Sequence, residues 1–166
     1  MTLRSRPSVS TKGSSNAVSH DRQNENSTEL RQVNNQRWDE LIGSIAPNVY
    51  HRFGGNHAIG GQRHDRDTLR IWFGRLGRVL PNLKIEVKDI WVTGWPWDTM
   101  VFVRWDAAAT LLDGGPYSQH AMHVITLRWG KIHALDVFED SQEVARALVV
   151  QAAAGLEEAV AEPIVS

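Results

Sequence analysis

The sequence predicts an α+β domain, in which helical segments come first and antiparallel strands follow. Two segments, at residues 29–46 and 65–80, carry apolar side chains at helical spacing, and each is followed by a proline. Residues 83–138 instead form short runs rich in β-branched and aromatic residues, separated by turns that contain glycine. Elements in this order favour a bent sheet with helices covering one face.

The composition narrows the class of protein. The 166 residues carry 18 basic and 19 acidic side chains, a balance that argues against a general nucleic-acid-binding surface. The chain has no cysteine, which excludes disulfides and thiolate metal ligands, and it has no apolar run long enough to span a bilayer. His51, His57 and His64 lack the spacing of a helical zinc motif. We therefore expect a cytoplasmic protein without a metal, a nucleic-acid partner or a membrane partner.

Three parts are expected along the chain. Residues 1–28 are rich in Ser, Asn and Gln and cannot offset their ordering entropy by burial, so they are expected to be a disordered leader. Residues 29–142 are expected to form the folded domain. Residues 143–166 are expected to add a C-terminal helix and tail, and Asp140 and Glu143 have capping-box spacing at its start.

The first helix is expected over residues 29–46, where Pro47 stops it. The glycine-rich loop at residues 54–61 lacks the glycine spacing and the lysine of phosphate-binding loops, so we interpret it as a rim. Asp65 or Asp67 is expected to cap the second helix, which Pro81 ends.

Four strands are expected in the second half of the chain. Turn signals lie at residues 94–98, 113–116 and 130–131. The strands between these turns are expected at residues 83–92, 100–112, 117–129 and 132–138.

Two of these strands carry ionisable side chains that an apolar strand would not favour. Alternate side chains share one face of a strand, so Arg104 and Asp106 point the same way, as do Asp136 and Phe138. If the sheet curves, these charges can converge in one cavity. A register slip of one residue would turn all of them to the opposite face.

Several short stretches, taken together, resemble one family. The order and spacing of these stretches are similar to those of the SnoaL-like proteins of the nuclear transport factor 2-like superfamily. The matching pieces are Tyr50–Phe53, residues 61–73, Pro81–Leu83, Val101–Trp105 and Arg128–Phe138.

The resemblance implies a cone-shaped fold, in which a curved antiparallel sheet and helices over its concave face enclose an apolar pocket. Members include polyketide cyclases, ketosteroid isomerases, dehydratases, limonene-type epoxide hydrolases and domains that only bind ligands. Many are homodimers that pair through the outer face of the sheet. Fold membership alone therefore does not fix the function.

The resemblance also assigns candidate catalytic residues. Asp136 matches the aspartate that acts as acid or base in the cyclases and epoxide hydrolases, and desolvation in an apolar pocket would raise its pKa. Arg104 and Asp106 repeat the Arg-x-Asp spacing of the epoxide hydrolases and are expected to be its electrostatic partners. The expected substrate-binding residues are Tyr50, His120, Phe138, Trp72 and Met122.

Two departures from the family pattern bear on the reaction. The epoxide hydrolases place an Asn where this chain has Arg52, which cannot accept a hydrogen bond. The ketosteroid isomerases have a carboxylate base in the region that here runs from Tyr50 to Gly61 without one. We therefore expect a cofactor-independent enzyme of the cyclase, isomerase or dehydratase type, acting on an apolar polycyclic or terpenoid-sized compound. An epoxide hydrolase and a non-catalytic ligand-binding or dimerisation module are the alternatives.

Overall fold

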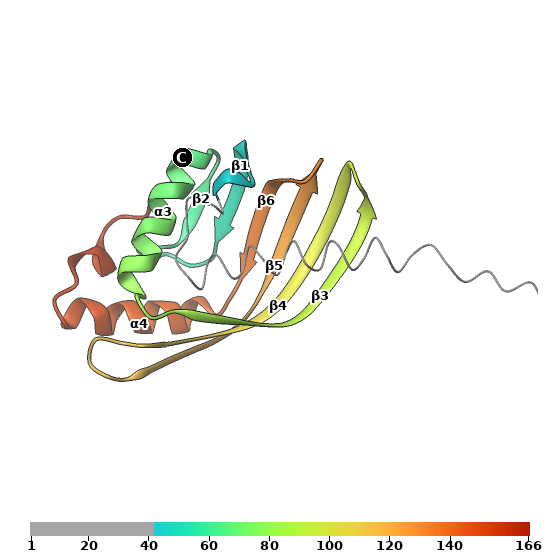
Figure 1. Ribbon diagram of the computed structural model, residues 1–166. Coiled ribbons are helices and arrows are strands. Elements are labelled where there is room, and N and C mark those ends of the chain that lie inside the picture. The colour runs from blue at the N-terminus through green and yellow to red at the C-terminus, as the bar shows by residue number, and fades with distance from the viewer. Residues whose placement is uncertain (1–41) are drawn as a thin grey trace, which may run out of the picture.

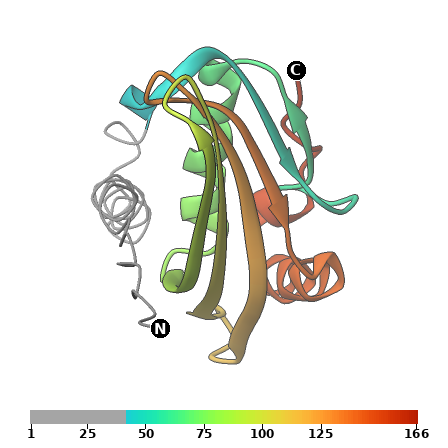
Figure 2. The same cartoon turned by 90° about the vertical axis from the view of Figure 1, so that its right-hand side faces the viewer.

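A computed structural model describes residues 42–166 of the chain and shows a six-stranded curved sheet with two helices and one 3₁₀ turn (Figures 1 and 2). The strand order across the sheet is β2-β1-β6-β5-β4-β3. The strands are β1 (Ile45–Phe53), β2 (Gly61–Arg63), β3 (Lys84–Trp95), β4 (Asp98–Thr110), β5 (Pro116–Arg128) and β6 (Lys131–Phe138).

The strands β3 to β6 form the antiparallel meander that the sequence predicts. The tight link between β5 and β6 consists of Trp129 and Gly130, whose φ angles of 50° and 75° suit a two-residue hairpin turn. β1 pairs antiparallel with β2 but parallel with β6, so the sheet as a whole is mixed. No short turn joins β1 to β6, and the long intervening chain leaves their relative direction free.

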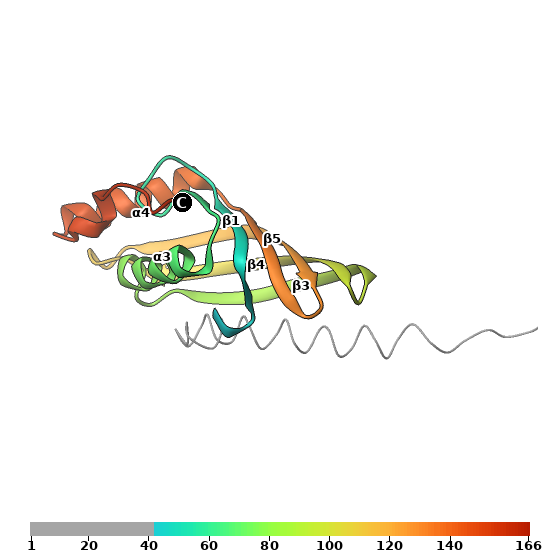
Figure 3. The ribbon, with the colours of Figure 1, turned by 90° about the horizontal axis from the view of Figure 1, so that it is seen from above.

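Helix α3 (Arg66–Val79) lies across the concave face of the sheet, and α4 (Ser141–Ala153) lies at one end of it beside β5 (Figures 1 and 3). The Asp65 side chain caps α3 by accepting a 2.7 Å hydrogen bond from the Thr68 amide. Asp140 caps α4 in the same way, through the amides of Gln142 and Glu143. Both caps agree with the sequence prediction. The 3₁₀ turn η1 (Glu157–Val160) and the C-terminal tail follow α4.

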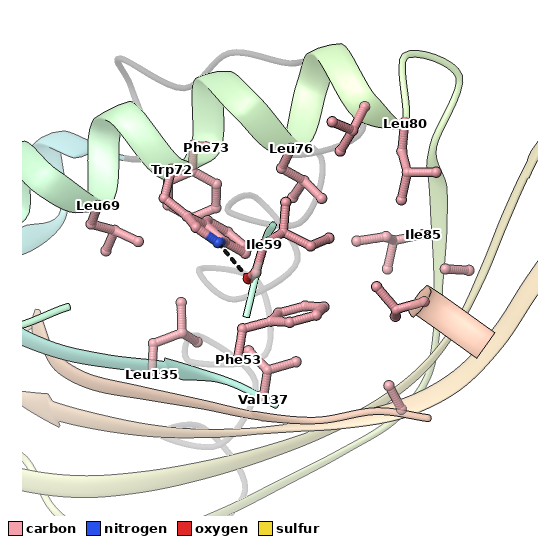
Figure 4. Close-up of a cluster of buried hydrophobic side chains, with 14 of the residues drawn as sticks. Phe53, Ile59, Leu69, Trp72, Phe73, Leu76, Leu80, Ile85, Leu135 and Val137 are labelled. Carbon is pink, nitrogen blue, oxygen red and sulfur yellow. Dashed lines mark hydrogen bonds between the residues drawn. The ribbon is translucent and has the colours of Figure 1, made fainter. Parts of the chain in front are cut away.

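The hydrophobic core lies between α3 and the concave face (Figure 4). From the helix, Trp72, Phe73 and Leu76 point toward Phe53 and Val137 on the strands. The Trp72 indole donates a 2.7 Å hydrogen bond to the Ile59 carbonyl, which fixes the ring between helix and sheet. Packing of this kind holds α3 at a defined distance from the sheet.

One predicted boundary is wrong. The helix expected to run to Ala46 has ended by Ser44, because Ile45 and Ala46 begin β1. Ile45 pairs with Ile132 and is 1% exposed, so sheet pairing overrides the local helical pattern. The rest of that helix and the expected disordered leader lie outside the described residues. Within residues 42–166 there is no helix that is both long and apolar enough to cross a membrane.

Candidate functional site

Strands β4, β5 and β6 each present a clearly different side-chain set to each face of the sheet. On β4, Val101, Val103, Trp105 and Ala107 point to the concave side and are at most 5% exposed. Val103, Trp105 and Ala107, with residues of α3, β1, β3, β5 and β6, line one pocket. The apolar lining includes Phe53, Trp72, Phe73, Leu76, Ile125 and Val137.

Besides Trp72, whose Nε1 donates to the Ile59 carbonyl, five lining residues carry polar side-chain atoms: His51, Trp105, Tyr117, Gln119 and His123. None of the described residues that line the pocket has a charged side chain at neutral pH, since its two histidines are held neutral by burial. An apolar pocket with a few convergent neutral polar groups is typical of small-molecule sites. Such a lining favours uncharged ligands, because an unpaired charge would be desolvated there.

His51 is the pocket residue with the most unusual surroundings. It is 0% exposed, and neither ring nitrogen has a hydrogen-bond partner within residues 42–166. Its ring lies 4.5 Å from that of Trp72. Burial, then the charges of Arg63 and His123, hold the pKa of His51 well below its usual range. A neutral imidazole presents one donor and one acceptor, and both are free for a ligand.

The second pocket histidine, His123, lies on β5 and is half-buried. Burial lowers the pKa of His123 to about 4, and its ring is 5.0 Å from that of Trp105. Trp105 Nε1 and Gln119 Oε1 are buried, and neither has a partner among the described residues. A buried polar atom without a partner costs on the order of 1–3 kcal/mol. These atoms are therefore well suited to meet polar groups of a bound molecule.

Tyr117 also lines the pocket, near its end closest to α4. Burial, together with the nearby charge of Glu139, raises the pKa of the Tyr117 phenol, so it stays protonated and can donate. Burial also raises the pKa of Glu139 itself, although this carboxyl accepts a 3.4 Å hydrogen bond from the Gly54 amide.

The predicted catalytic residues do not face this pocket, and the expectation that they converge inside it is wrong. Arg104, Asp106 and Asp136 alternate with the pocket-lining residues and therefore point to the outer, convex face. These three side chains do share one face of the sheet, as the sequence predicts, but that face is the convex one and not the pocket face.

On the outer face, each of the two aspartates pairs with side chains of neighbouring strands. Asp136 Oδ1 accepts a 2.7 Å hydrogen bond from Arg52 Nε. Asp106 Oδ1 lies 2.6 Å from His120 Nδ1, and its other oxygen lies 3.4 Å from Lys88 Nζ. The hydrogen bond with His120 is the main reason that the pKa of Asp106 is lowered.

The two carboxylates also lie far apart along the sheet. On the shared neighbour β5, Asp106 pairs with His120 and Asp136 with Val124, four residues further on. They cannot hold one water between them in the pocket. The arrangement expected of an epoxide hydrolase is therefore absent from the pocket among residues 42–166.

Of the predicted substrate-binding residues, only Trp72 lines the pocket. Tyr50, His120, Met122 and Phe138 lie on the outer face, and Phe138 is 49% exposed with the Arg52 guanidinium 4.8 Å from its ring centroid. The reason is again the two-residue period: His120 and Met122 alternate with Gln119, Ala121 and His123, which point inward.

Sequence reasoning missed His51, His123, Trp105, Gln119 and Tyr117 as pocket residues. A signal for them exists in the strict apolar alternation Val101, Val103, Trp105, Ala107, which marks the buried face of β4. Antiparallel pairing through the turn at residues 111–115 then carries that face to the odd-numbered residues of β5. No group of three or more potential metal ligands occurs in the part of the chain that the structure describes.

Comparison with known proteins places this fold in a family. The SnoaL-like domain matches residues 29–135. No curated protein matches the chain. Solved structures with the nuclear transport factor 2-like fold do match, including a protein of unknown function from Exiguobacterium, which is 16% identical with a TM-score of 0.59 over 70% of this chain and 98% of the other.

Two further similar structures come from enzymes or suspected enzymes. One is the epoxide hydrolase/cyclase-like enzyme SalBIII of pyran ring formation in salinomycin, 20% identical with a TM-score of 0.62 over 75% of this chain and 95% of the other. Another is a putative polyketide cyclase from Sinorhizobium meliloti, 15% identical with a TM-score of 0.55 over 69% of this chain and 93% of the other. Identities this low establish a shared fold only.

Proposed function

The chain belongs to the SnoaL-like family, and on that premise we propose that it is a cofactor-independent acid/base enzyme acting on an uncharged, apolar compound of polycyclic or terpenoid size. The observation that carries the proposal is His51, a buried neutral histidine with two unpaired ring nitrogens in a pocket lined by no charged side chain. Because its pKa is lowered, this imidazole is unprotonated at neutral pH, and its free ring nitrogen can take a proton from a bound molecule.

The proposed roles follow from the chemistry of each side chain. His51 takes a proton from the bound molecule at one atom and returns it at another, so isomerisation, cyclisation or dehydration needs no further reactant. Trp105 Nε1 donates to, and Gln119 Oε1 accepts from, oxygen-bearing groups of the substrate. Trp72 and Phe73 pack against the apolar body of the substrate.

A matched pair of variants tests this proposal. His51→Gln removes the proton acceptor from the pocket, and Asp136→Asn removes the outer-face carboxylate that the family resemblance favours. In a turnover screen of hydroxylated and carbonyl-bearing polycyclic and terpenoid compounds, His51→Gln should lower kcat by about 10²- to 10⁴-fold. Asp136→Asn should keep wild-type kcat. The opposite result, with loss of turnover only in Asp136→Asn, would overturn the assignment.

A second candidate function is ligand binding without catalysis. It is favoured by the lack of any carboxylate among the described residues that line the pocket. In that case a compound of this class raises the Tm and is recovered unchanged, and His51→Gln weakens its binding without any turnover to lose. Mass spectrometry of the compound after prolonged incubation separates the two candidates.

We also propose that the protein is a homodimer that pairs through the outer face of the sheet. Trp91, Met100 and Phe138 lie on that face and are 49%, 39% and 49% exposed. Large apolar side chains that remain exposed in this way are typical of contact surfaces. Sedimentation should give twice the chain mass, and Trp91→Arg should give the monomer. A monomeric wild type at micromolar concentration would contradict the proposal. The cytoplasmic location stays a prediction.

A further inference from the structure

Arg63, the last residue of β2, is a fully buried guanidinium, 0% exposed. It donates to the Gly60 carbonyl at 3.1 Å, to the Ile164 carbonyl of the C-terminal tail at 3.2 Å and to the Gly61 carbonyl. All three acceptors are neutral backbone groups. No carboxylate pairs with Arg63 among residues 42–166, so its positive charge is not cancelled locally. An arginine rarely stays buried without an acidic partner.

This guanidinium lies directly behind the pocket wall. Arg63 Cζ is 5.1 Å from the ring centroid of Trp72, which lines the pocket. His51 is another neighbour of that indole, with ring centroids 4.5 Å apart. Because Trp72 Nε1 is tied to the Ile59 carbonyl, the ring holds one position relative to both. A cation near an indole face stabilises that position further.

Strand pairing brings the charge close to His51 itself. His51 and Arg63 are cross-strand partners in the β1–β2 ladder. The other elements around His51 bring no acidic group: β6 contributes Leu135, α3 contributes Trp72 and Phe73, and β5 contributes His123, which like Arg63 disfavours a proton on His51. A proton on His51 would therefore face an uncancelled guanidinium in an apolar environment, where repulsion is weakly screened.

We propose that Arg63 is a positioning residue of this site, whose buried charge keeps His51 unprotonated and whose guanidinium fixes the Trp72 wall of the pocket. The inference rests on the proposed role of His51 as the proton acceptor. Its two parts are separable, because the charge acts on the protonation of His51 and the guanidinium fork acts on the placement of Trp72. Both parts concern a residue that touches no substrate atom.

Three variants separate these parts. Arg63→Gln removes the charge, and Arg63→Lys keeps a charge but loses the fork that reaches three carbonyls. Arg75→Gln is the matched control, because Arg75 also holds the tail through the Glu162 carbonyl and holds the Ala58 carbonyl. The readout is NMR titration of the His51 imidazole, with thermal unfolding to establish that each variant is folded.

Arg63→Gln should raise the pKa of His51 by about 1 unit or more, the effect expected when a nearby like charge is removed. Arg63→Lys should leave that pKa near the wild-type value while raising KM through a looser Trp72 wall. Arg75→Gln should change neither. An unchanged His51 titration in folded Arg63→Gln, or an equal rise in Arg75→Gln, overturns the proposal.

The wild-type protein supplies a second test in case Arg63→Gln does not fold. Burial and the cross-strand guanidinium of Arg63 both disfavour a proton on His51. On acidification through the usual range of a histidine, His51 should therefore stay unprotonated. Protonation of His51 in that range would overturn the proposal.

The titration also keeps this inference distinct from the proposed function. If His51→Gln abolishes turnover but Arg63→Gln leaves the His51 titration unchanged, the function stands and the role of Arg63 fails. If Arg63→Gln raises the His51 pKa but no compound turns over, the electrostatic role stands and the proposed function fails. If the proposed function and the role of Arg63 are both correct, Arg63→Gln should move the acid limb of the kcat/KM profile to higher pH, together with the titration of His51.

Discussion

The two faces of the sheet differ in environment although the same strands form both: side chains on the outer face are exposed to solvent, and those on the inner face line the pocket. On the outer face of β5, His120 is 85% exposed at its side chain and lies 2.6 Å from Asp106. On the inner face of the same strand, His123 lines the pocket and is half-buried, and desolvation lowers its pKa to about 4. Two histidines three residues apart therefore lie in different surroundings, and the face of the strand, not the residue type, decides which one reaches the pocket.

The comparison extends to the charged residues. Outer-face ions lie in pairs, such as Arg104 with Asp89 and Lys88 with Glu86. Solvent screens such pairs, and each contributes little to stability. The inner face instead holds neutral polar atoms without partners, of which Trp105 Nε1 and Gln119 Oε1 are two. Paired charges have little left to offer a ligand, whereas unpaired neutral atoms can bind one.

The largest difference in the free energy of unfolding is expected when a charged residue is introduced on each face of the sheet in turn. Val103, 0% exposed, points inward, and Ala108 on the same strand is exposed on the outer face opposite Lys84. Val103→Asp should lower the free energy of unfolding by about 3–5 kcal/mol, because it buries an unpaired carboxyl. Ala108→Asp should stay within about 0.5 kcal/mol of wild type. Urea denaturation measures both, and equal effects would contradict the assignment of the faces.

Acid should destabilise the protein through the inner histidines. His123 has an unfolded pKa of 6.5 and a folded pKa of about 4, so below pH 6.5 the unfolded state binds a proton that the folded state does not. Stability is therefore full above pH 6.5 and is lost as the pH falls toward about 4. From pH 8 to pH 5, His123 alone should cost about 2 kcal/mol.

Carboxylates with lowered pKa values, such as Asp106, do not yet titrate in the window above pH 5. His51, whose pKa is also lowered by burial, contributes in the same direction as His123, so the His123 share is read from a variant. His123→Gln should flatten the slope of unfolding free energy against pH. An unaltered slope in His123→Gln would show that the ring is solvated in solution.

Gln119→Leu should change stability in the direction opposite to most core substitutions. Gln119 is 3% exposed and its Oε1 has no partner in the described chain, so removal of the amide relieves a desolvation penalty. We expect the free energy of unfolding to rise by about 0–1 kcal/mol. Binding of an oxygen-bearing ligand should weaken at the same time. A clear loss of stability in chemical denaturation would mean that the amide is satisfied by water.

The smallest effect is expected for His120→Ala. The pair that His120 forms with Asp106 lies on the solvent-exposed outer face. Thermal unfolding of the variant should give a Tm within experimental error of wild type, and turnover should be unchanged. A loss of turnover would assign the outer face a role in catalysis.

Local sequence signals predict a structural feature well where that feature depends only on residues that are close together in the sequence. The Asp65 cap and the stop at Pro81 each depend on a few neighbouring residues, and each lies where expected. The last hairpin turn lies at Trp129 and Gly130, one residue before the predicted 130–131. The period of two also groups side chains correctly, since Arg104 and Asp106 do share a face. The end of the first helix fails because Ile45 is held by its pairing with Ile132, far along the chain.

The sequence by itself therefore determines the α+β class, the SnoaL-like family and the two sets of side chains on each strand. Only the tertiary structure decides which set is inside. That choice depends on which face α3 covers, and α3 packs through Trp72 and Leu76 against residues from distant strands. The chemistry of the pocket follows from the same choice, because burial and the guanidinium of Arg63, not the residue type, make His51 a neutral histidine.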